Sequence, residues 1–370
     1  MAEPPDVRIG IDARELTGQP TGVGRYVFGL LRSWAADETT RRHEFILYAH
    51  AALSALLPSP QFTTRVVPGR GGTLWEQGAL AAAARTDRLD RFFAPGYTAP
   101  LLLRTPTVVA IHDVSFAAHP EWFSSREGIR RRFLTRRAAG RAAAVVTISN
   151  FSKGEIVTHL GVPDERVQVI PPGVDVPWRG AASALKGQRL GSARRVLYVG
   201  SIFNRRHVPD LIAAAGQLTQ TSPEVSLDLV GDNRSYPRQD IAALIERQGA
   251  IGRLRWHRYV SDEELQMLYG AARAFAFLSE YEGLGLTPLE ALSLGIPALL
   301  LDTPVARESC GQAALYVRKG DVAGTADALH ALLFDESVRE RLLSLAPAQL
   351  ARYDWPTAAR RTLEVIEGAR

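Results

Sequence analysis

The sequence predicts an α/β protein with two consecutive, doubly wound parallel-sheet domains. Short apolar runs alternate with helical patterns along most of the chain, which is typical of parallel sheets covered by helices on both faces. The proline- and glycine-rich stretch 171–195 interrupts this alternation and is the best linker candidate. A chain of 370 residues is also long enough for two domains of ordinary size.

The first domain begins with a short buried strand at residues 7–11. A glycine-rich turn follows at residues 17–24, and a helix is expected at residues 25–36. Further short apolar runs bounded by turn residues predict strands at 44–48, 107–111 and 143–148.

The same alternation restarts after the linker. Strands are expected at residues 195–199, 226–230, 253–257, 274–278 and 298–301. Helices are expected at residues 209–218, 240–248 and 262–270, and for about two turns from residue 287.

These patterns predict a first domain of residues 1–178, joined by a C-terminal helix at residues 355–370, and a second domain of residues 179–354. Doubly wound domains bind ligands at the carboxyl ends of their strands. We therefore expect the ligand in the cleft between the two domains.

The composition is that of a globular protein of a reducing compartment. Cys310 is the single cysteine, so no intramolecular disulfide can form. The first residues lack the basic and apolar regions of a signal peptide, and there is no run of about 18 apolar residues to span a bilayer. We therefore expect a cytoplasmic protein. The formal net charge of +5 arises in residues 1–180, which contain 22 basic and 17 acidic side chains.

The stretch 280–297 has two physical interpretations. In the first, Thr287 caps a short helix, Pro288 takes its first position, and Glu290 completes a capping box. Gly295 then ends that helix.

In the second interpretation, the same stretch holds a ligand. Gly283 and Gly285 let backbone amides approach a ligand at a helix N-terminus, which favours phosphate. Glu282 could then accept hydrogen bonds from sugar hydroxyls, and Glu290 from a ribose diol. Paired carboxylates also suit glycoside hydrolysis, but the glycine loop and helix start between them favour a phosphate ligand.

These residues also carry a resemblance to a known family. The Glu-x7-Glu spacing of Glu282 and Glu290, written here as Glu-Gly-Leu-Gly-Leu-Thr-Pro-Leu-Glu, is similar to the signature of family four of the retaining glycosyltransferases. Further similar segments, in the family's order, are residues 111–113, 148–152, 172–175, 199–207 and 261–269. The resemblance covers most of the chain. It implies the GT-B fold, with two Rossmann-like domains, and a mannosyltransferase-like subgroup.

The resemblance implies a nucleoside-diphosphate sugar as co-substrate, with no metal and no other cofactor. Arg205 and Arg206 would hold the donor diphosphate, because guanidinium groups bind phosphate oxygens bidentately and stay charged. From the residues alone, the pair could also be solvated in a loop. The family has lysine at the position of Arg206. Glu282 would hold the sugar, and the other donor-binding candidates are Gly200, Tyr259, Gly283, Leu284, Gly285, Leu286, Thr287 and Glu290.

The first domain contributes two further candidate sites. His112 and Asp113 end an apolar strand, where α/β sheets place functional side chains, although the histidine could merely end the strand. By resemblance, His112 lies beside the donor sugar and Asp113 orients it. Gly22 and Gly24 belong to a loop that the resemblance places near the acceptor.

A strongly basic helix is expected at Arg126–Arg141, with seven arginines and one acid. The arginines could form a solvated face, contact an anionic membrane, or bind a phosphate-bearing acceptor. We do not expect nucleic-acid binding, because aromatic residues are not interleaved with the arginines. If the arginines contact a membrane, we expect the protein to bind peripherally at the inner face of that membrane.

Together, these features predict a retaining glycosyltransferase that moves a hexose, such as mannose, to a saccharide or lipid-linked acceptor. One alternative is another enzyme on the same fold, such as a nucleotide-sugar epimerase or a phosphorylase. A phosphorylase using pyridoxal phosphate would need a Schiff-base lysine, and the chain contains three lysines, Lys153, Lys186 and Lys319. A second alternative is a non-catalytic sugar-nucleotide binding protein.

Overall fold

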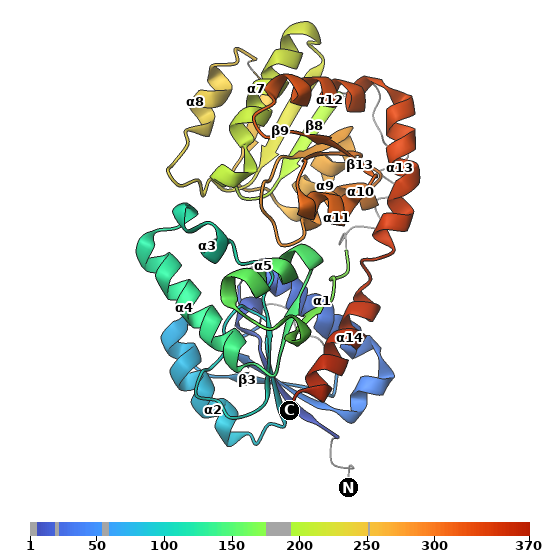
Figure 1. Ribbon diagram of the computed structural model, residues 1–370. Coiled ribbons are helices and arrows are strands. Elements are labelled where there is room, and N and C mark those ends of the chain that lie inside the picture. The colour runs from blue at the N-terminus through green and yellow to red at the C-terminus, as the bar shows by residue number, and fades with distance from the viewer. Residues whose placement is uncertain (1–5, 19–21, 54–58, 175–193, 251) are drawn as a thin grey trace. The chain divides into compact units, whose positions relative to one another are not determined.

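The computed structural model describes residues 6–18, 22–53, 59–174, 194–250 and 252–370 (Figure 1). The chain divides into unit 1, which is Met1–Gly173 with Tyr353–Arg370, and unit 2, which is Val174–Arg352. The predicted boundary between residues 178 and 179, and most of the predicted linker, lie outside the described residues.

Within the described ranges, unit 1 contains a sheet of seven strands whose neighbours are all parallel. Its order is β3-β2-β1-β4-β5-β6-β7. The strands are β1 (Arg8–Asp12), β2 (Glu44–Ala49), β3 (Phe62–Val66), β4 (Arg91–Ala94), β5 (Thr107–Ala110), β6 (Ala144–Thr147) and β7 (Val167–Val169). The inner strands are apolar runs, because helices cover both faces of a parallel sheet.

The helices of unit 1 include the C-terminal one. They are α1 (Gly22–Ala36), α2 (Ala81–Thr86), α3 (Ser115–Ala118), α4 (Ser125–Arg141), α5 (Asn150–Leu160) and α14 (Trp355–Gly368). The Trp34 indole N–H donates to the Ala359 carbonyl at 2.9 Å, which joins α1 to α14. Gly29 lies against Trp355, since a Cβ at position 29 would be 2.5 Å from the indole ring. The last helix therefore completes the core of unit 1, beside α1 (Figure 1).

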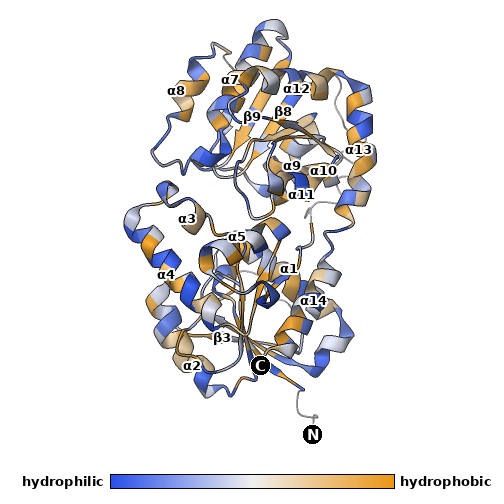
Figure 2. Ribbon diagram, viewed as in Figure 1, coloured by the Kyte–Doolittle hydropathy of each residue, from blue (hydrophilic) through white to orange (hydrophobic). Residues whose placement is uncertain are grey.

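Within the part of the chain that the structure describes, unit 2 contains a parallel sheet of six strands. The order of the strands is β10-β9-β8-β11-β12-β13. The strands are β8 (Arg194–Val199), β9 (Val225–Val230), β10 (Leu254–His257), β11 (Ala274–Phe277), β12 (Ala298–Leu301) and β13 (Ala314–Val317). The helices are α7 (Val208–Thr221), α8 (Ile241–Glu246), α9 (Asp262–Ala271), α10 (Leu286–Ser293), α11 (Pro304–Cys310), α12 (Val322–Phe334) and α13 (Glu336–Leu350). Apolar residues concentrate along strands such as β8 and β9 (Figure 2).

Both sheets reverse their strand order beside their first strand. In unit 1 the chain runs outward from β1 to β3 and returns to β4, on the other side of β1. In unit 2 it runs from β8 to β10 and returns to β11, on the other side of β8. Loops diverge at such a switch point, and doubly wound sheets bind ligands there. We therefore expect functional residues in the loops that follow β1 and β4 in unit 1, and in those that follow β8 and β11 in unit 2.

The prediction of two doubly wound α/β domains is confirmed. One boundary differs in a way that matters for function, because α1 begins at Gly22 rather than at Arg25. Among the residues that the structure describes, no helix is both long enough and apolar enough to cross a membrane.

Candidate active site

The loops after β8 and β11 are joined at the switch point of unit 2. The backbone N–H of Glu280 donates to the Arg205 carbonyl at 2.8 Å. His207 Nε2 lies 3.1 Å from a Glu280 carboxylate oxygen, which Lys319 also contacts. Burial would raise the pKa of Glu280, but its hydrogen bonds with Lys319 and His207 hold it below the ordinary value. The loop that carries the arginines is thereby fixed against the start of the glutamate motif.

Arg206 and Glu282 form an ion pair across these two loops. Arg206 Nε donates to Glu282 Oε1 at 2.8 Å, and the exposed fractions of the two side chains are 13% and 18%. Arg206 Nη1 also donates to the Ser201 carbonyl, and the Ser279 hydroxyl donates to Glu282 Oε1, each at 2.8 Å. Burial would lower the pKa of Arg206, but the Glu282 carboxylate and the Tyr198 hydroxyl outweigh it and raise that pKa. Arg206 therefore remains a cation that holds Glu282 in place.

Arg205 has different surroundings. Its guanidinium carbon lies 4.2 Å from the centre of the Phe203 ring, a cation–π contact, and the residue is half-buried. Both arginines lie on the short 3-10 turn Asn204–Arg206, which directly precedes α7. Both guanidinium groups lie near the Phe203 ring, but Arg206 is also engaged by the Glu282 carboxylate.

Gly200 is required by the close packing behind Arg206. Its φ is +147°, which side chains rarely adopt, and a Cβ there would lie 2.7 Å from Arg206 Nη1. Gly231, at the end of β9, approaches even more closely, since its Cβ would lie 2.1 Å from the Gly200 carbonyl oxygen. These contacts give Gly200 a direct part in the geometry of the candidate site.

The start of α10 contradicts the predicted capping box. The N-cap is Gly285, with φ 85° and ψ 67°, and no side chain of the described residues caps it. Thr287 is therefore the second helical residue and Glu290 the fifth, so the prediction that they form the cap is wrong. The helix starts early because Gly285, which has no Cβ, can take up a left-handed conformation. Pro288 is tolerated in the first turn, where backbone N–H groups have no intrahelical partner.

The rest of the motif follows the prediction more closely. Leu284 is buried, and the other candidates around the helix start are half-buried, namely Gly283, Gly285, Leu286 and Thr287. Gly295 ends the helix with φ 72°, and the next residue, Ile296, donates its N–H to the Ala291 carbonyl at 3.0 Å. The helix is thus a short one whose N-terminal amides follow the glycine turn.

Glu290 and Tyr259 are the remaining donor-binding candidates of unit 2. Glu290 is half-buried in the second turn of α10. Tyr259 is 72% exposed and follows β10, the edge strand, which β9 separates from β8. The structure therefore brings Gly200, Arg205, Arg206 and Glu282 together and leaves Tyr259 at the margin of unit 2.

His112 and Asp113 follow β5 in unit 1. His112 is buried, and burial, which outweighs its bond to Pro95 and the nearby Asp113, lowers the pKa of its imidazole. Its Nε2 lies 2.9 Å from the Pro95 carbonyl oxygen, which can only accept, so Nε2 carries the proton and Nδ1 is the acceptor. Asp113 accepts from the Tyr97 hydroxyl and from the Ser115 N–H, each at 2.9 Å. The carbonyl, rather than Asp113, is the hydrogen-bond partner shown for the imidazole.

Gly22 and Gly24 lie on a helix rather than in a loop. They occupy the first turn of α1, where Gly22 is exposed and Gly24 is buried. The interpretation of this segment as a loop was therefore wrong at these positions. The candidates remain at the carboxyl end of β1, beside the switch point of unit 1.

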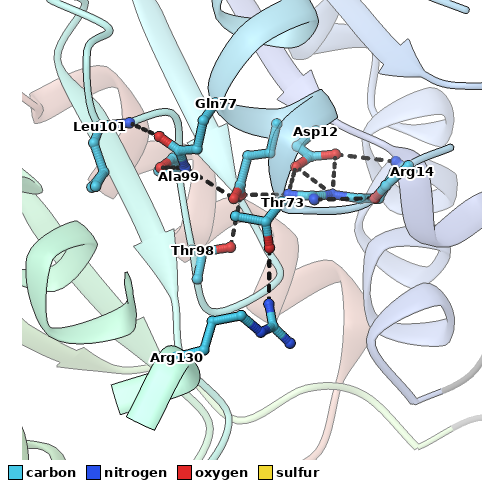
Figure 3. A network of polar contacts seen from close by, with 10 residues as sticks. Asp12, Arg14, Thr73, Gln77, Thr98, Ala99, Leu101 and Arg130 are labelled. Atoms are coloured by element: carbon cyan, nitrogen blue, oxygen red, sulfur yellow. Dashed lines mark hydrogen bonds and ion pairs between the residues drawn. The ribbon is translucent and has the colours of Figure 1, made fainter. Parts of the chain in front are cut away.

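A buried polar network that the sequence analysis did not identify lies at the same switch point (Figure 3). Arg14 Nη2 donates to Asp12 Oδ2 and to Glu76 Oε1, each at 2.5 Å, and both carboxylates are almost fully buried. Burial raises the pKa of Asp12, although the positive charge of Arg14 lowers it in part. The two carboxylates raise the pKa of Arg14 and outweigh the opposite effect of burial. The Thr98 hydroxyl, after β4, donates to Glu76 at 2.7 Å. The network ties the loops after β1 and β4 together.

The helix α4 presents the predicted arginines together with exposed apolar side chains. Ile129 and Phe133 are 58% and 55% exposed on its outer face. Arg130 donates to the Thr73 hydroxyl at 2.8 Å (Figure 3), which places the neighbouring Leu74, 91% exposed, beside the same helix. Three large apolar side chains thus stand among arginines on one surface of unit 1.

Two family models match the chain. The model described as "Glycosyl transferases group 1" matches residues 186–347, and the model described as "Glycosyltransferase Family 4" matches residues 20–177.

Individual relatives are consistent with these matches. O-antigen chain mannosyltransferase B of Escherichia coli is 28% identical over 285 residues, which is 75% of this chain and 74% of that protein. The GDP-mannose:cellobiosyl-diphosphopolyprenol alpha-mannosyltransferase of Xanthomonas oryzae pv. oryzae is 27% identical over 71% of this chain and 68% of that protein. The crystal structure of Anabaena HepE with UDP and glucose has a TM-score of 0.73 at 22% identity, over 98% of this chain and 99% of HepE. This last likeness is one of fold.

Proposed function

We propose that this chain is a retaining hexosyltransferase of the GT-B type, because its two parts match the models for glycosyl transferases group 1 and for glycosyltransferase family 4. It moves a hexose from a nucleoside-diphosphate sugar to a saccharide or lipid-linked saccharide. The observation that carries the proposal is the Arg206–Glu282 pair at the switch point of unit 2, beside a glycine turn that opens a helix. Mannose is the first sugar to test, since both relatives named above are mannosyltransferases.

Unit 2 has the groups that such a donor requires. Arg205 and the first amides of α10 bind the diphosphate, because a guanidinium and a helix N-terminus both attract phosphate oxygens. Glu282, held by Arg206, accepts hydrogen bonds from sugar hydroxyls. Glu290 binds the ribose diol. Its carboxylate does not cap α10, because Gly285 is the N-cap of that helix.

The candidates in unit 1 are His112 and the two glycines at the start of α1. The neutral imidazole donates through Nε2 to Pro95, so Nδ1 can accept a hydrogen bond from a hydroxyl of the transferred sugar. Gly22, which is exposed in the first turn of α1, can let an acceptor approach the backbone closely, and Gly24 is buried in the same turn.

The reaction we propose uses no nucleophile from the protein and no bound metal. The bond between the anomeric carbon and the diphosphate oxygen breaks as the acceptor oxygen bonds to the same face of the sugar. The acceptor proton passes to the departing diphosphate oxygen. Catalysis then comes from positioning and from stabilising the charge that develops on the diphosphate, which is the part of Arg205 and the α10 amides.

The test is transfer from a nucleoside-diphosphate hexose to a panel of saccharide and polyprenyl-diphosphate saccharide acceptors, with the product's anomeric configuration followed by NMR. A retained configuration supports the proposal, and an inverted one contradicts it. Epimerised donor without acceptor would favour an epimerase. Tight donor binding with neither hydrolysis nor transfer would favour a non-catalytic binding protein.

We further propose that the chain is cytoplasmic and contacts an anionic membrane through a surface formed by Leu74, Ile129, Phe133 and the arginines of α4. Arginines among exposed apolar side chains suit the boundary between headgroups and acyl chains. A lipid-linked acceptor would be presented at such a membrane.

A further inference from the structure

Tyr97, which follows β4, has an unusual backbone conformation. Its φ is +69°, in the left-handed region that bulky side chains avoid. Such a conformation persists where surrounding contacts impose it, and it often marks a functional site. The backbone N–H of Tyr97 donates to the Ala110 carbonyl at 3.0 Å, which anchors the residue to the end of β5, two residues before His112.

The Tyr97 side chain contacts the His112–Asp113 pair in two ways. Its ring meets the imidazole edge to face, with centroids 5.6 Å apart, and its hydroxyl donates to Asp113 Oδ2 at 2.9 Å. Tyr26 also packs edge to face on the imidazole, at 4.7 Å. The Pro95 carbonyl, two residues before Tyr97, accepts from His112 Nε2. One short loop thus sets both the tautomer and the packing of His112.

The buried network of unit 1 holds this loop in place (Figure 3). Thr98, next to Tyr97, donates its hydroxyl to Glu76, which Arg14 also binds. The Gln77 side chain donates to the Ala99 carbonyl at 3.0 Å and accepts from the Leu101 N–H at 2.8 Å. Polar contacts therefore hold the backbone on the C-terminal side of Tyr97.

We propose that Tyr97 is a positioning residue for His112 in sugar transfer, held in its strained conformation by the Thr98–Glu76–Arg14 contacts. This inference rests on the proposed function, in which His112 Nδ1 accepts from the transferred sugar. The hydroxyl bond to Asp113 holds the Tyr97 ring against one side of the imidazole, so Tyr97 aims Nδ1 and prevents the His112 ring from rotating away.

The test compares Tyr97→Phe with Tyr48→Phe in the full-length chain. Tyr48 donates its hydroxyl to Asp87 at 2.6 Å, so the control loses a similar tyrosine–aspartate bond elsewhere in unit 1. We expect Tyr97→Phe to lower kcat about tenfold, as for a slightly misplaced group, with donor KM changed much less. The ¹⁵N NMR signals of His112 should also shift in position, while the Nε2–H tautomer that the Pro95 carbonyl sets is kept. Tyr48→Phe should leave both readouts unchanged, and Thr98→Val should shift them in the same direction as Tyr97→Phe.

Equal kcat values and unchanged His112 signals in Tyr97→Phe would overturn the inference. His112→Ala separates this result from a failure of the proposed function. If His112→Ala transfers sugar at the wild-type rate, the role of His112 itself is wrong. If His112→Ala is impaired while Tyr97→Phe is not, only the inference about Tyr97 fails.

Discussion

Arg206 Nε and Glu282 Oε1 lie 2.8 Å apart, although the two residues are separated by 76 positions in the chain. The sequence motifs suggest that the two residues act independently, with Arg206 binding the diphosphate and Glu282 binding the sugar. The structure makes them a single unit, in which the arginine holds the carboxylate that we propose binds the sugar. A change at either residue therefore acts on both.

The first prediction concerns this coupling. The variants Arg206→Gln and Glu282→Gln should each lower kcat/KM strongly, and the double variant should lose less than the sum of the two. A coupling free energy of about 0.5–3 kcal/mol is typical of residues in contact. Additive losses, measured as the logarithm of kcat/KM across the cycle, would show that the pair does not act as a unit.

The second prediction separates Arg205 from its neighbour. Because Arg205 rests on Phe203 and is proposed to bind the diphosphate, Arg205→Ala should lower kcat by about 100-fold, as loss of an oxyanion donor does. Arg341→Ala, an exposed arginine of α13, is the control and should be neutral. Similar rates for the two variants would remove Arg205 from the site.

A third prediction uses the close packing at Gly200. Gly200→Ala would place a Cβ 2.7 Å from Arg206 Nη1, so it should displace the arginine and reduce transfer sharply. Gly249→Ala is a matched control, because Gly249 also has positive φ but a Cβ there would meet no described atom within 4 Å beyond its chain neighbours. Gly249→Ala should lose about 1–2 kcal/mol of stability from its left-handed backbone, and Gly200→Ala, at φ +147°, should lose at least as much. Activity lost equally in both would mean that strain alone, not the contact with Arg206, is responsible.

The fourth prediction follows from the corrected start of α10. Since Gly285 is the N-cap, Glu290→Gln should leave the melting temperature nearly unchanged. The same variant should weaken donor binding, because the amide loses the charge and half of the acceptor sites of the carboxylate. Isothermal titration and a melting curve on the same sample check both parts. A large fall in melting temperature without loss of affinity would return Glu290 to a structural role.

The fifth prediction concerns the surface on α4. Phe133→Ser should weaken binding to phosphatidylglycerol vesicles, measured by cosedimentation, about tenfold or more, since each buried apolar side chain contributes about 1.5–3 kcal/mol. Met267→Ser, which removes a side chain 63% exposed on α9 of unit 2, should have no effect. Binding should weaken with salt, because the screening length falls from about 10 Å at 0.1 M to about 3 Å at 1 M. Equal binding to neutral phosphatidylcholine vesicles would speak against an anionic surface.

Local sequence patterns predicted several apolar inner strands, but they missed the inner strand β4 (Arg91–Ala94). The run Ala298–Leu301 is strand β12 at the predicted bounds, because a fully buried strand has a simple apolar signature. The edge strand β3 (Phe62–Val66) was not predicted, since its exposed threonines carry no apolar alternation. The start of α10 was misplaced because Thr287 is a better capping residue by type than Gly285, and only the backbone shows which of them is used.

The candidate site was predicted in part, for a physical reason. Arg205, Arg206 and Glu282 are marked by their motifs, but their contacts depend on β8 and β11 being neighbours, and strand order is not a local property. Asp12, Arg14 and Glu76 carry no motif. Their network depends on loops more than 60 residues apart, so spacing alone could not reveal it.

The most direct test of the central claim is a thermal-shift screen with GDP, UDP, ADP and dTDP and their sugars, on the wild-type chain and on Arg205→Ala. A ligand that binds only the native state raises its stability as the ligand concentration increases. We predict that one nucleotide and its sugar raise the melting temperature of the wild type, and that Arg205→Ala loses most of that rise. No shift with any of them, or an equal shift in Arg205→Ala, would contradict the claim that unit 2 binds a nucleoside-diphosphate sugar at this site.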